Sequence, residues 1–264
     1  MKSVKDKVVV ITGATAGIGK ATALYFAERG AKVVCLARRT VEGMDCISTD
    51  VTDKDAVNRA IEQISEKYGK IDVLVNNAGM GISGSIEDTD SAAAHKIFEL
   101  NFFGALNVIQ AVLPVMRAGV GGVIVNVSSV AAKLSIPFQA FYSATKAAVS
   151  SLSAALRAEV APFNIKVTSV LPGDVKTDFT ASREKNVSDN PVYGDRIRRS
   201  VATMERDEKN GMPPVVIAKD IYRLATMKNP PITKTGGKKY ALFVALAKFL
   251  PERAVNKLLA ALYA

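Results

Sequence analysis

The stretch VVVITGATAGIG, residues 8–19, decides the fold of this chain. Its first four residues are β-branched, which is typical of a strand buried on both faces of a parallel sheet. A glycine-rich turn follows at once, and behind it an apolar helix runs through Phe26 and ends near Gly30. A second apolar run at 32–37 completes the unit, which predicts two parallel strands joined by a crossover helix.

The same alternation of strands and helices continues along the chain. Three more strands are predicted at 71–75, 123–127 and 165–170, and two long helices at 91–116 and 141–161. The sequence therefore predicts an α/β fold: a single-domain, doubly wound Rossmann fold over residues 1–264. Its mostly parallel sheet is expected to have about seven strands, with helices on both faces.

Two local features refine this expectation. Residues 39–46 leave room for little more than a short loop, so the crossover helix usual at that point is predicted to be reduced or absent. Thr52 is predicted to cap the next helix, with Asp55 in the position of its capping-box partner.

Composition favours a protein that folds around one apolar core. The chain has 264 residues, of which 48% are hydrophobic and 23% charged. Cys35 and Cys46 lie in apolar strand-like runs and are expected to be reduced, and with His95 as the single histidine no metal site is predicted. We expect a cytoplasmic location, because the N-terminus lacks a signal-peptide core and no uninterrupted apolar run reaches membrane length.

The formal net charge is +10. Such an excess could serve nucleic acid, an anionic membrane or an anionic cofactor. The basic residues are scattered and no nucleic-acid recognition motif accompanies them, so no nucleic-acid partner is predicted. Most of these cations are expected on the solvated surface, with a few on cofactor phosphates.

The glycine-rich turn carries the first candidate site. Backbone N–H groups at a strand–turn–helix junction can approach a pyrophosphate, which the positive helix N-terminus also attracts. The alternative is a turn with a purely structural role. Its context favours a dinucleotide, and the predicted contacts are Gly13, Thr15, Gly17, Ile18 and Gly19.

The end of the second predicted strand bears on which dinucleotide binds. An NAD enzyme usually has a carboxylate there for the ribose 2′-hydroxyl. This chain has Ala37 followed by Arg38 and Arg39, and a guanidinium can bind a 2′-phosphate through paired hydrogen bonds. NADP(H) is therefore preferred over NAD(H), unless the arginines only line a solvated loop; Asp50 and Val51 are expected at the adenine.

A third group of residues suits proton exchange. Tyr142 and Lys146 are four residues apart at the start of a predicted helix, so they share one face. The ammonium, together with an oxidised nicotinamide, is expected to lower the tyrosine pKa, and the Ser129 hydroxyl follows a strand where it can bind a substrate oxygen. Taken singly, these residues have ordinary alternatives: a half-buried aromatic, a surface cation and a helix cap.

Together these motifs identify a family resemblance. The glycine turn, Asn76-Asn77-Ala78-Gly79, Asn101, Ser128-Ser129, Tyr142-Ser143-Ala144-Thr145-Lys146 and Pro172-Gly173 stand in the order of the short-chain dehydrogenases/reductases. The resemblance covers residues 7–177. It implies an oxidoreductase that interconverts ketone or aldehyde and alcohol, with Tyr142 as general acid and base.

The resemblance also assigns individual roles. Ser129 is the catalytic serine, Asn101 holds a water that connects Lys146 to solvent, and Lys146 also binds the nicotinamide ribose. Further cofactor contacts are expected from Asn77, Ala78, Gly79, Pro172, Gly173, Val175 and Thr177.

The chain beyond residue 177 is expected to determine substrate choice. Residues 180–215 are predicted to be a substrate-covering lid or disordered, and residues 240–264 a C-terminal extension. This ending resembles 17β-hydroxysteroid and retinol dehydrogenases, which favours a lipophilic, steroid- or retinoid-like substrate. An apolar pocket is predicted from Phe138, Phe141, Phe179 and Met204.

Alternatives stay open for this region. The same motifs fit a reductase of 3-oxoacyl thioesters, and the fold also supports non-catalytic NADP-sensing or scaffold proteins. The apolar and basic residues of 240–264 could contact a membrane, but a packed amphipathic helix or a subunit contact is favoured. We expect a homodimer or homotetramer without membrane attachment.

Overall fold

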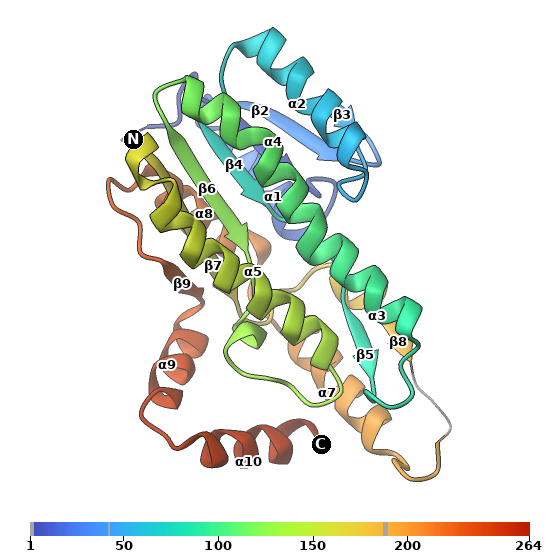
Figure 1. The fold of residues 1–264 in the computed structure, drawn as a ribbon. Coiled ribbons are helices and arrows are strands. Elements are labelled where there is room, and N and C mark those ends of the chain that lie inside the picture. The colour runs from blue at the N-terminus through green and yellow to red at the C-terminus, as the bar shows by residue number, and fades with distance from the viewer. Residues whose placement is uncertain (1–2, 42, 187–189) are drawn as a thin grey trace.

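The computed structural model describes residues 3–41, 43–186 and 190–264. Seven parallel strands form one sheet in the order β3-β2-β1-β4-β6-β7-β9, as Figure 1 shows. The strands are β1 Val8–Thr12, β2 Lys32–Ala37, β3 Asp45–Ser48, β4 Val73–Asn76, β6 Gly122–Val127, β7 Ile165–Pro172 and β9 Thr233–Gly236. The predicted α/β doubly wound fold is confirmed.

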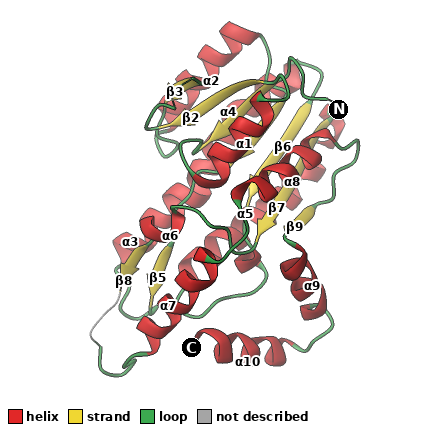
Figure 2. Ribbon diagram, turned by 180° about the vertical axis from the view of Figure 1, so that it is seen from behind, coloured by secondary structure: helices red, strands yellow, loops and turns green. Residues whose placement is uncertain are grey.

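Helices cover both faces of the sheet (Figure 1, Figure 2). The helices on one face are α1 Gly17–Ala27 and α8 Pro214–Thr226, and those on the other are α2 Lys54–Tyr68, α4 Gly104–Ala118 and α5 Ala140–Glu159. Alternating side chains of β1 divide between two apolar cores. Val8 and Val10 join the core beneath α2, α4 and α5, whereas Val9 and Ile11 join the core beneath α1 and α8.

The strand order reverses between β1 and β4, and this position determines where a ligand can bind. In open parallel sheets the loops at such a reversal diverge and leave a crevice at the carboxyl ends of the strands. Asn76 at the end of β4 donates from Nδ2 to Asn126 Oδ1 of β6 at 3.0 Å, which ties the two strands beside the crevice.

The connection between β2 and β3 is a short loop, as predicted; no helix occurs among its described residues. The predicted cap of α2 is wrong by one residue. Asp53 is the N-cap, and its carboxylate accepts from the backbone N–H groups of Asp55 and Ala56. Thr52 instead donates its hydroxyl to Asp50 at 2.8 Å, because α2 begins only at Lys54.

The helix predicted at 91–116 is continuous but contains a π-helical segment. It comprises α3 Ser91–Phe98, η1 Glu99–Phe103 and α4. Contrary to the sequence-based expectation, this 28-residue helix is long and apolar enough to cross a membrane. Val108, Val112 and Met116, however, lie in the core beneath it, so its apolar face covers the sheet.

Smaller elements surround the carboxyl ends of the strands (Figure 2). They are β5 Ile82–Gly84, η2 Val130–Ala132, α6 Phe179–Ser182, β8 Glu184–Asn186, α7 Arg196–Lys209, α9 Lys238–Ala247 and α10 Glu252–Tyr263. η3 Ala161–Phe163 lies instead at the opposite end of the sheet, directly before β7. β5 pairs with β8, so the predicted lid region contains a paired strand as well as the helix α7. Pro251 separates α9 from α10, since a proline cannot continue the first helix.

Candidate active site

The glycine turn between β1 and α1 requires glycine for steric reasons. Gly13 has a φ of +63°, and a Cβ there would lie 2.9 Å from the Ala78 Cα. A Cβ on Gly19 would collide with the Gly13 carbonyl oxygen and would lie 2.5 Å from the Asn77 amide nitrogen. The turn therefore packs directly against the loop after β4, and a side chain at either position would force the two loops apart.

Thr12 and Asn77 join these two loops. The Thr12 hydroxyl accepts from the backbone N–H groups of Asn77 and Ala78 at 2.9 and 3.0 Å. The Asn77 side-chain amide donates to the carbonyls of Thr12 and Gly13 at 3.0 and 3.1 Å. Thr12 was not among the predicted site residues, although a hydroxyl at the carboxyl end of an otherwise aliphatic strand could have drawn attention to it.

The N-terminus of α1 fits a bound pyrophosphate. Asp53 caps α2 and Asp90 caps α3 with side-chain carboxylates, but Ala16 provides α1 with no such cap. The positive end of α1 is thus left for a ligand anion, with Thr15 and Ile18 in this turn. A Cβ on Gly17 would lie 3.2 Å from the Thr177 methyl group, so the loop after β7 closes the turn from the other side.

The predicted binding site for the adenosine end of the cofactor combines exposed charges with a buried apolar side chain. Arg38 is exposed after β2, and neither Arg38 nor Arg39 makes an ion pair with the part of the chain that the structure describes. The backbone N–H of Thr52 holds the pKa of the Asp50 carboxyl below its usual value, and the charge of Arg38 adds to this effect. Val51 is buried behind Asp50.

Tyr142 and Lys146 lie on α5, as their spacing predicts, and the Ser129 hydroxyl lies close enough to the Tyr142 phenol to lower its pKa. Ser129 is the N-cap of η2, where its Oγ accepts from the Ala131 N–H at 3.1 Å. The structure thus brings the three predicted catalytic residues together at the carboxyl end of β6.

The electrostatics of this group differ from the prediction. Burial raises the pKa of Tyr142 to about 12, and the nearby Ser129 hydroxyl offsets part of this rise. Burial also lowers the pKa of Lys146 to about 8. Lys146 Nζ donates to the Val127 carbonyl at 3.0 Å and lies 5.7 Å from the centre of the Tyr142 ring. The lowering of the tyrosine pKa by the ammonium and an oxidised nicotinamide acting together stays a prediction, and in the polypeptide by itself burial is the largest effect on this pKa and raises it.

Asn101 lies in the π-helical segment η1 and is buried. Its amide nitrogen donates to the Met80 carbonyl at 3.0 Å and to Thr145 Oγ1 at 3.1 Å, and its Oδ1 accepts from the Met80 N–H at 2.8 Å. A Cβ on Gly79 would lie 3.0 Å from this Oδ1 and 3.5 Å from Lys146 Nζ. The side chain of Asn101 thus holds the β4–β5 loop against α5, and its predicted water contact stays a prediction.

The loop after β7 forms the opposite wall. A Cβ on Gly173 would collide with the ring of Tyr240, whose hydroxyl donates to Asp174. Burial raises the pKa of the Asp174 carboxyl above its usual value. Pro172 ends β7, and Val175 forms a parallel bridge with Met212. Tyr240 and Asp174 were not predicted, because the sequence does not reveal that the C-terminal extension returns to β7.

The lid contributes an aromatic ring and a buried ion pair. The Phe179 ring lies 5.7 Å from the Tyr142 ring, and the Arg183 guanidinium lies 6.0 Å from the centre of the Phe179 ring. Arg183 has a fully buried side chain and is paired with Glu208 of α7, whose second oxygen accepts from the Thr180 hydroxyl at 2.6 Å. Arg183 and Glu208 were missed because buried and exposed charges are indistinguishable in a polar stretch of sequence.

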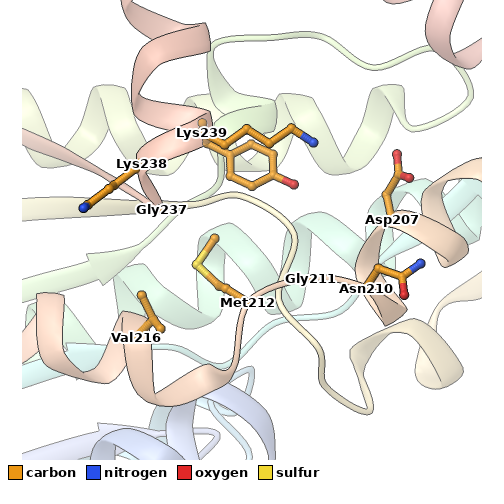
Figure 3. A pocket seen from close by; sticks show the side chains of 9 residues that line it. Asp207, Asn210, Gly211, Met212, Val216, Gly237, Lys238 and Lys239 are labelled. Atoms are coloured by element: carbon orange, nitrogen blue, oxygen red, sulfur yellow. The ribbon is translucent and has the colours of Figure 1, made fainter.

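A pocket of about 410 Å³ lies between the end of α7 with the three residues that follow it, α8 and the start of α9. In Figure 3 the Met212 side chain points into it between Val216 and Gly237, while Asp207 and Asn210 lie at its other end. None of the four residues predicted to form an apolar pocket lines it. Met204 is buried within the fold, and Phe138 contacts Tyr193 of the lid instead, with ring centres 6.1 Å apart.

Comparison with known proteins decides the family. The family described as short chain dehydrogenase matches residues 7–188, which is more than half of the chain. This protein belongs to the short-chain dehydrogenase family. It is accordingly an oxidoreductase with a nucleotide-binding Rossmann fold that acts on carbonyl or alcohol groups.

Two curated relatives match over most of the chain. The 3-ketodihydrosphingosine reductase of Bacteroides thetaiotaomicron is 40% identical, with 98% of this chain and 99% of the relative covered. Dehydrogenase/reductase SDR family member 7B of Danio rerio is 34% identical, with 89% of this chain and 79% of the relative covered.

Solved structures of family members share the fold. A short-chain dehydrogenase from Streptomyces avermitilis is 32% identical with a TM-score of 0.85, and 94% of each chain is covered. A short-chain dehydrogenase from Burkholderia cenocepacia in complex with NADP is 26% identical with a TM-score of 0.78, covering 97% of this chain and 99% of that one. A 3-ketoacyl-(acyl-carrier-protein) reductase from Brucella melitensis, complexed with NADH, is 27% identical with a TM-score of 0.74, covering 89% and 99%.

Proposed function

We propose that this enzyme is an NADP(H)-dependent reductase of a long-chain lipophilic ketone, with Tyr142 as the proton donor. One observation carries the proposal: Ser129, Tyr142 and Lys146 lie together at the carboxyl end of β6, with Lys146 one helical turn from Tyr142 on α5. Packing by itself can bury these side chains together. Their arrangement is also the one that proton transfer to a carbonyl oxygen requires.

The chemistry divides between cofactor and protein. When bound, the nicotinamide supplies the hydride, and the protein must supply the proton. With a pKa of about 12, the Tyr142 phenol keeps its proton at neutral pH and can donate it to the oxygen of a ketone. Ser129 is positioned to hold that oxygen, and Lys146, next to Gly79, is positioned to hold the nicotinamide ribose.

The NADP(H) preference rests on the end of β2. Arg38 and Arg39 are exposed and free of ion pairs within the described chain, so either guanidinium is available for a 2′-phosphate. The Burkholderia relative solved with NADP agrees with this preference, whereas the Brucella relative was solved with NADH. The family alone therefore does not decide between the two cofactors.

The substrate class is supported by the relative from Bacteroides. Its 40% identity extends over almost the whole of both chains, including the lid and the C-terminal helices that surround Tyr142 and Gly173. Its name specifies a reductase of 3-ketodihydrosphingosine, so we select that long-chain ketone as the first candidate substrate. Steroid ketones, retinoid aldehydes and 3-oxoacyl thioesters are the comparison substrates.

A single panel tests this proposal. NADPH oxidation is measured with 3-ketodihydrosphingosine, a steroid ketone, a retinal and a 3-oxoacyl thioester, and each is repeated with NADH. We expect the highest kcat/KM with 3-ketodihydrosphingosine and NADPH. Arg38→Asp should reverse or abolish the cofactor preference, since its carboxylate would repel a 2′-phosphate. A preference for the thioester would refute the substrate assignment, and no turnover of any ketone would favour the non-catalytic alternative.

A further inference from the structure

The last two helices, residues 238–264, form a C-terminal arm with two distinct apolar faces (Figure 1, Figure 2). The inner face packs on the body of the protein. Val244 and Leu259 are buried there against Val130 and Leu134, which follow the catalytic Ser129. The inner face therefore accounts for how the arm is attached.

The outer face is apolar as well, but nothing in the described chain covers it. Its exposed residues are Leu242, Leu246, Phe249, Leu250, Leu258 and Leu262. Phe249, at the corner between the helices, is 87% exposed. The arm thus holds six of the fifteen large exposed apolar side chains found among the described residues, although it is only a tenth of the chain. Such a concentration marks an interaction surface.

Helical spacing shows that the outer residues form continuous stripes. Leu242 and Leu246 are four residues apart on α9, and Leu258 and Leu262 are four apart on α10, so each pair lies on one face. On α10 this stripe lies next to the buried one, while Arg253 and Lys257 form a separate charged row. The apolar face of α10 is therefore wider than the part of it that packs on the body of the protein.

The net charge of the arm indicates what kind of partner binds its outer face. It carries five basic residues (Lys238, Lys239, Lys248, Arg253 and Lys257) and one acidic residue, Glu252. In a two-fold contact between two copies of this chain, the basic surface of one arm would face the basic surface of the other, and this repulsion is unfavourable. An anionic lipid surface offers acyl chains to the leucines and negative headgroups to the lysines, as amphipathic helices require.

We propose that the C-terminal arm docks this enzyme on the surface of an anionic lipid bilayer, with Leu246, Phe249 and Leu250 inserted at the headgroup boundary. This differs from the expectation from sequence, which favours a packed amphipathic helix or a subunit contact for residues 240–264; only the inner face packs on the body of the protein. Tyr240 of the arm lies against Gly173, so docking also places the predicted active site near the lipid. The binding itself does not rest on the proposed substrate.

The test is flotation of the full-length protein with vesicles. We expect it to float with vesicles of equal parts phosphatidylglycerol and phosphatidylcholine, and to remain unbound with phosphatidylcholine alone or with the mixed vesicles at high salt. Lys248→Glu with Arg253→Glu should weaken the partition coefficient by about fivefold or more per residue. Leu246→Glu with Phe249→Glu should weaken it at least as much.

A matched variant controls for surface charge. Val120→Glu with Ile86→Glu also replaces two exposed apolar residues but lies outside the arm, and it should float like the wild type. Each variant is checked by its melting temperature and by turnover of a short-chain, water-soluble ketone. Absence of wild-type turnover with every ketone of the substrate panel would disprove the proposed function without affecting the flotation result.

Two outcomes would overturn the docking proposal. One is failure of the wild type to float with the anionic vesicles. The other is a wild type that sediments as a dimer while the variant Leu246→Glu with Phe249→Glu sediments as a monomer. That result would assign the outer face to a second copy of the chain.

Discussion

Lys146 Nζ donates a hydrogen bond to the Val127 carbonyl at 3.0 Å, at the last residue of β6. This bond fastens a buried lysine to the end of the sheet, between Tyr142 and the loop that carries Gly79. The lysine is thus oriented by the strand that delivers Ser129, and the helix that carries Tyr142 is anchored at the same point. Burial lowers the pKa of Lys146 to about 8, and this shift can be measured through the pH dependence of stability.

The first prediction concerns stability above neutral pH. Because the folded pKa of Lys146 is lower than the unfolded value of 10.5, the unfolded chain binds more protons between pH 8 and 10. The free energy of unfolding contributed by this residue should therefore rise with pH, by about 1 kcal/mol per pH unit. Chemical denaturation of wild type and Lys146→Met from pH 8 to 9.5 should show the two diverging. Lys133→Met, which removes an exposed lysine, serves as the control; parallel curves for wild type and Lys146→Met would contradict the burial of the charge.

The second prediction concerns how the rates of ketone reduction and alcohol oxidation depend on pH. Because the pKa of Tyr142 is raised to about 12, its proton stays in place from pH 6 to 9. Ketone reduction should therefore show little pH dependence from this group in that range. Alcohol oxidation needs the phenolate, so its kcat/KM should rise with pH, by up to about tenfold per unit. An oxidation rate that does not change between pH 6 and 9 would argue against Tyr142 as the base.

The third prediction concerns the ion pair in the lid. Glu208→Gln preserves shape but leaves the Arg183 guanidinium, whose side chain is fully buried, without its counter-charge. Unfolding free energy should fall by about 3 kcal/mol, as for other broken buried pairs. Removing both charges with Arg183→Met and Glu208→Leu should recover much of the loss. If Glu208→Gln unfolds at the same denaturant concentration as the wild type, the pair does not stabilise the lid.

The fourth prediction concerns the glycine turn. Gly19→Ala would place a Cβ against the Gly13 carbonyl and the Asn77 amide, which should distort the turn and weaken NADPH binding at least tenfold. Gly119→Ala at the end of α4 meets atoms no closer than 3.6 Å and should bind normally. Fluorescence titration of NADPH measures both. Equal affinities would show that the turn does not contact the cofactor.

Sequence patterns were sufficient for the glycine turn and for the strands of the sheet other than β3 and β9, because these depend on local signals. The β-branched runs of β1 and β6 identify buried strands, and glycine spacing reports backbone geometry that other residues cannot adopt. The same locality explains why Tyr142 and Lys146 could be paired from their four-residue spacing.

Features that depend on distant contacts could not be predicted. Arg183 and Glu208 are 25 residues apart in a polar stretch, and nothing in their own sequence shows that they are buried. The return of Tyr240 to Gly173 requires the path of β9 and α9, which no periodicity reports. The two faces of the C-terminal arm look alike in sequence, because both are apolar; only the fold shows that one of them is uncovered.

The most direct test of the proposed function is turnover by Tyr142→Phe. This variant keeps the ring that contacts Phe179 but removes the hydroxyl that lies near Ser129. Tyr222→Phe on α8, whose ring packs against Phe26 on the other face of the sheet, is the control. We predict that Tyr142→Phe binds NADPH normally but loses at least a hundredfold in kcat for ketone reduction, the range expected for a lost general acid. Turnover near that of the wild type would contradict the assignment of Tyr142 as the proton donor.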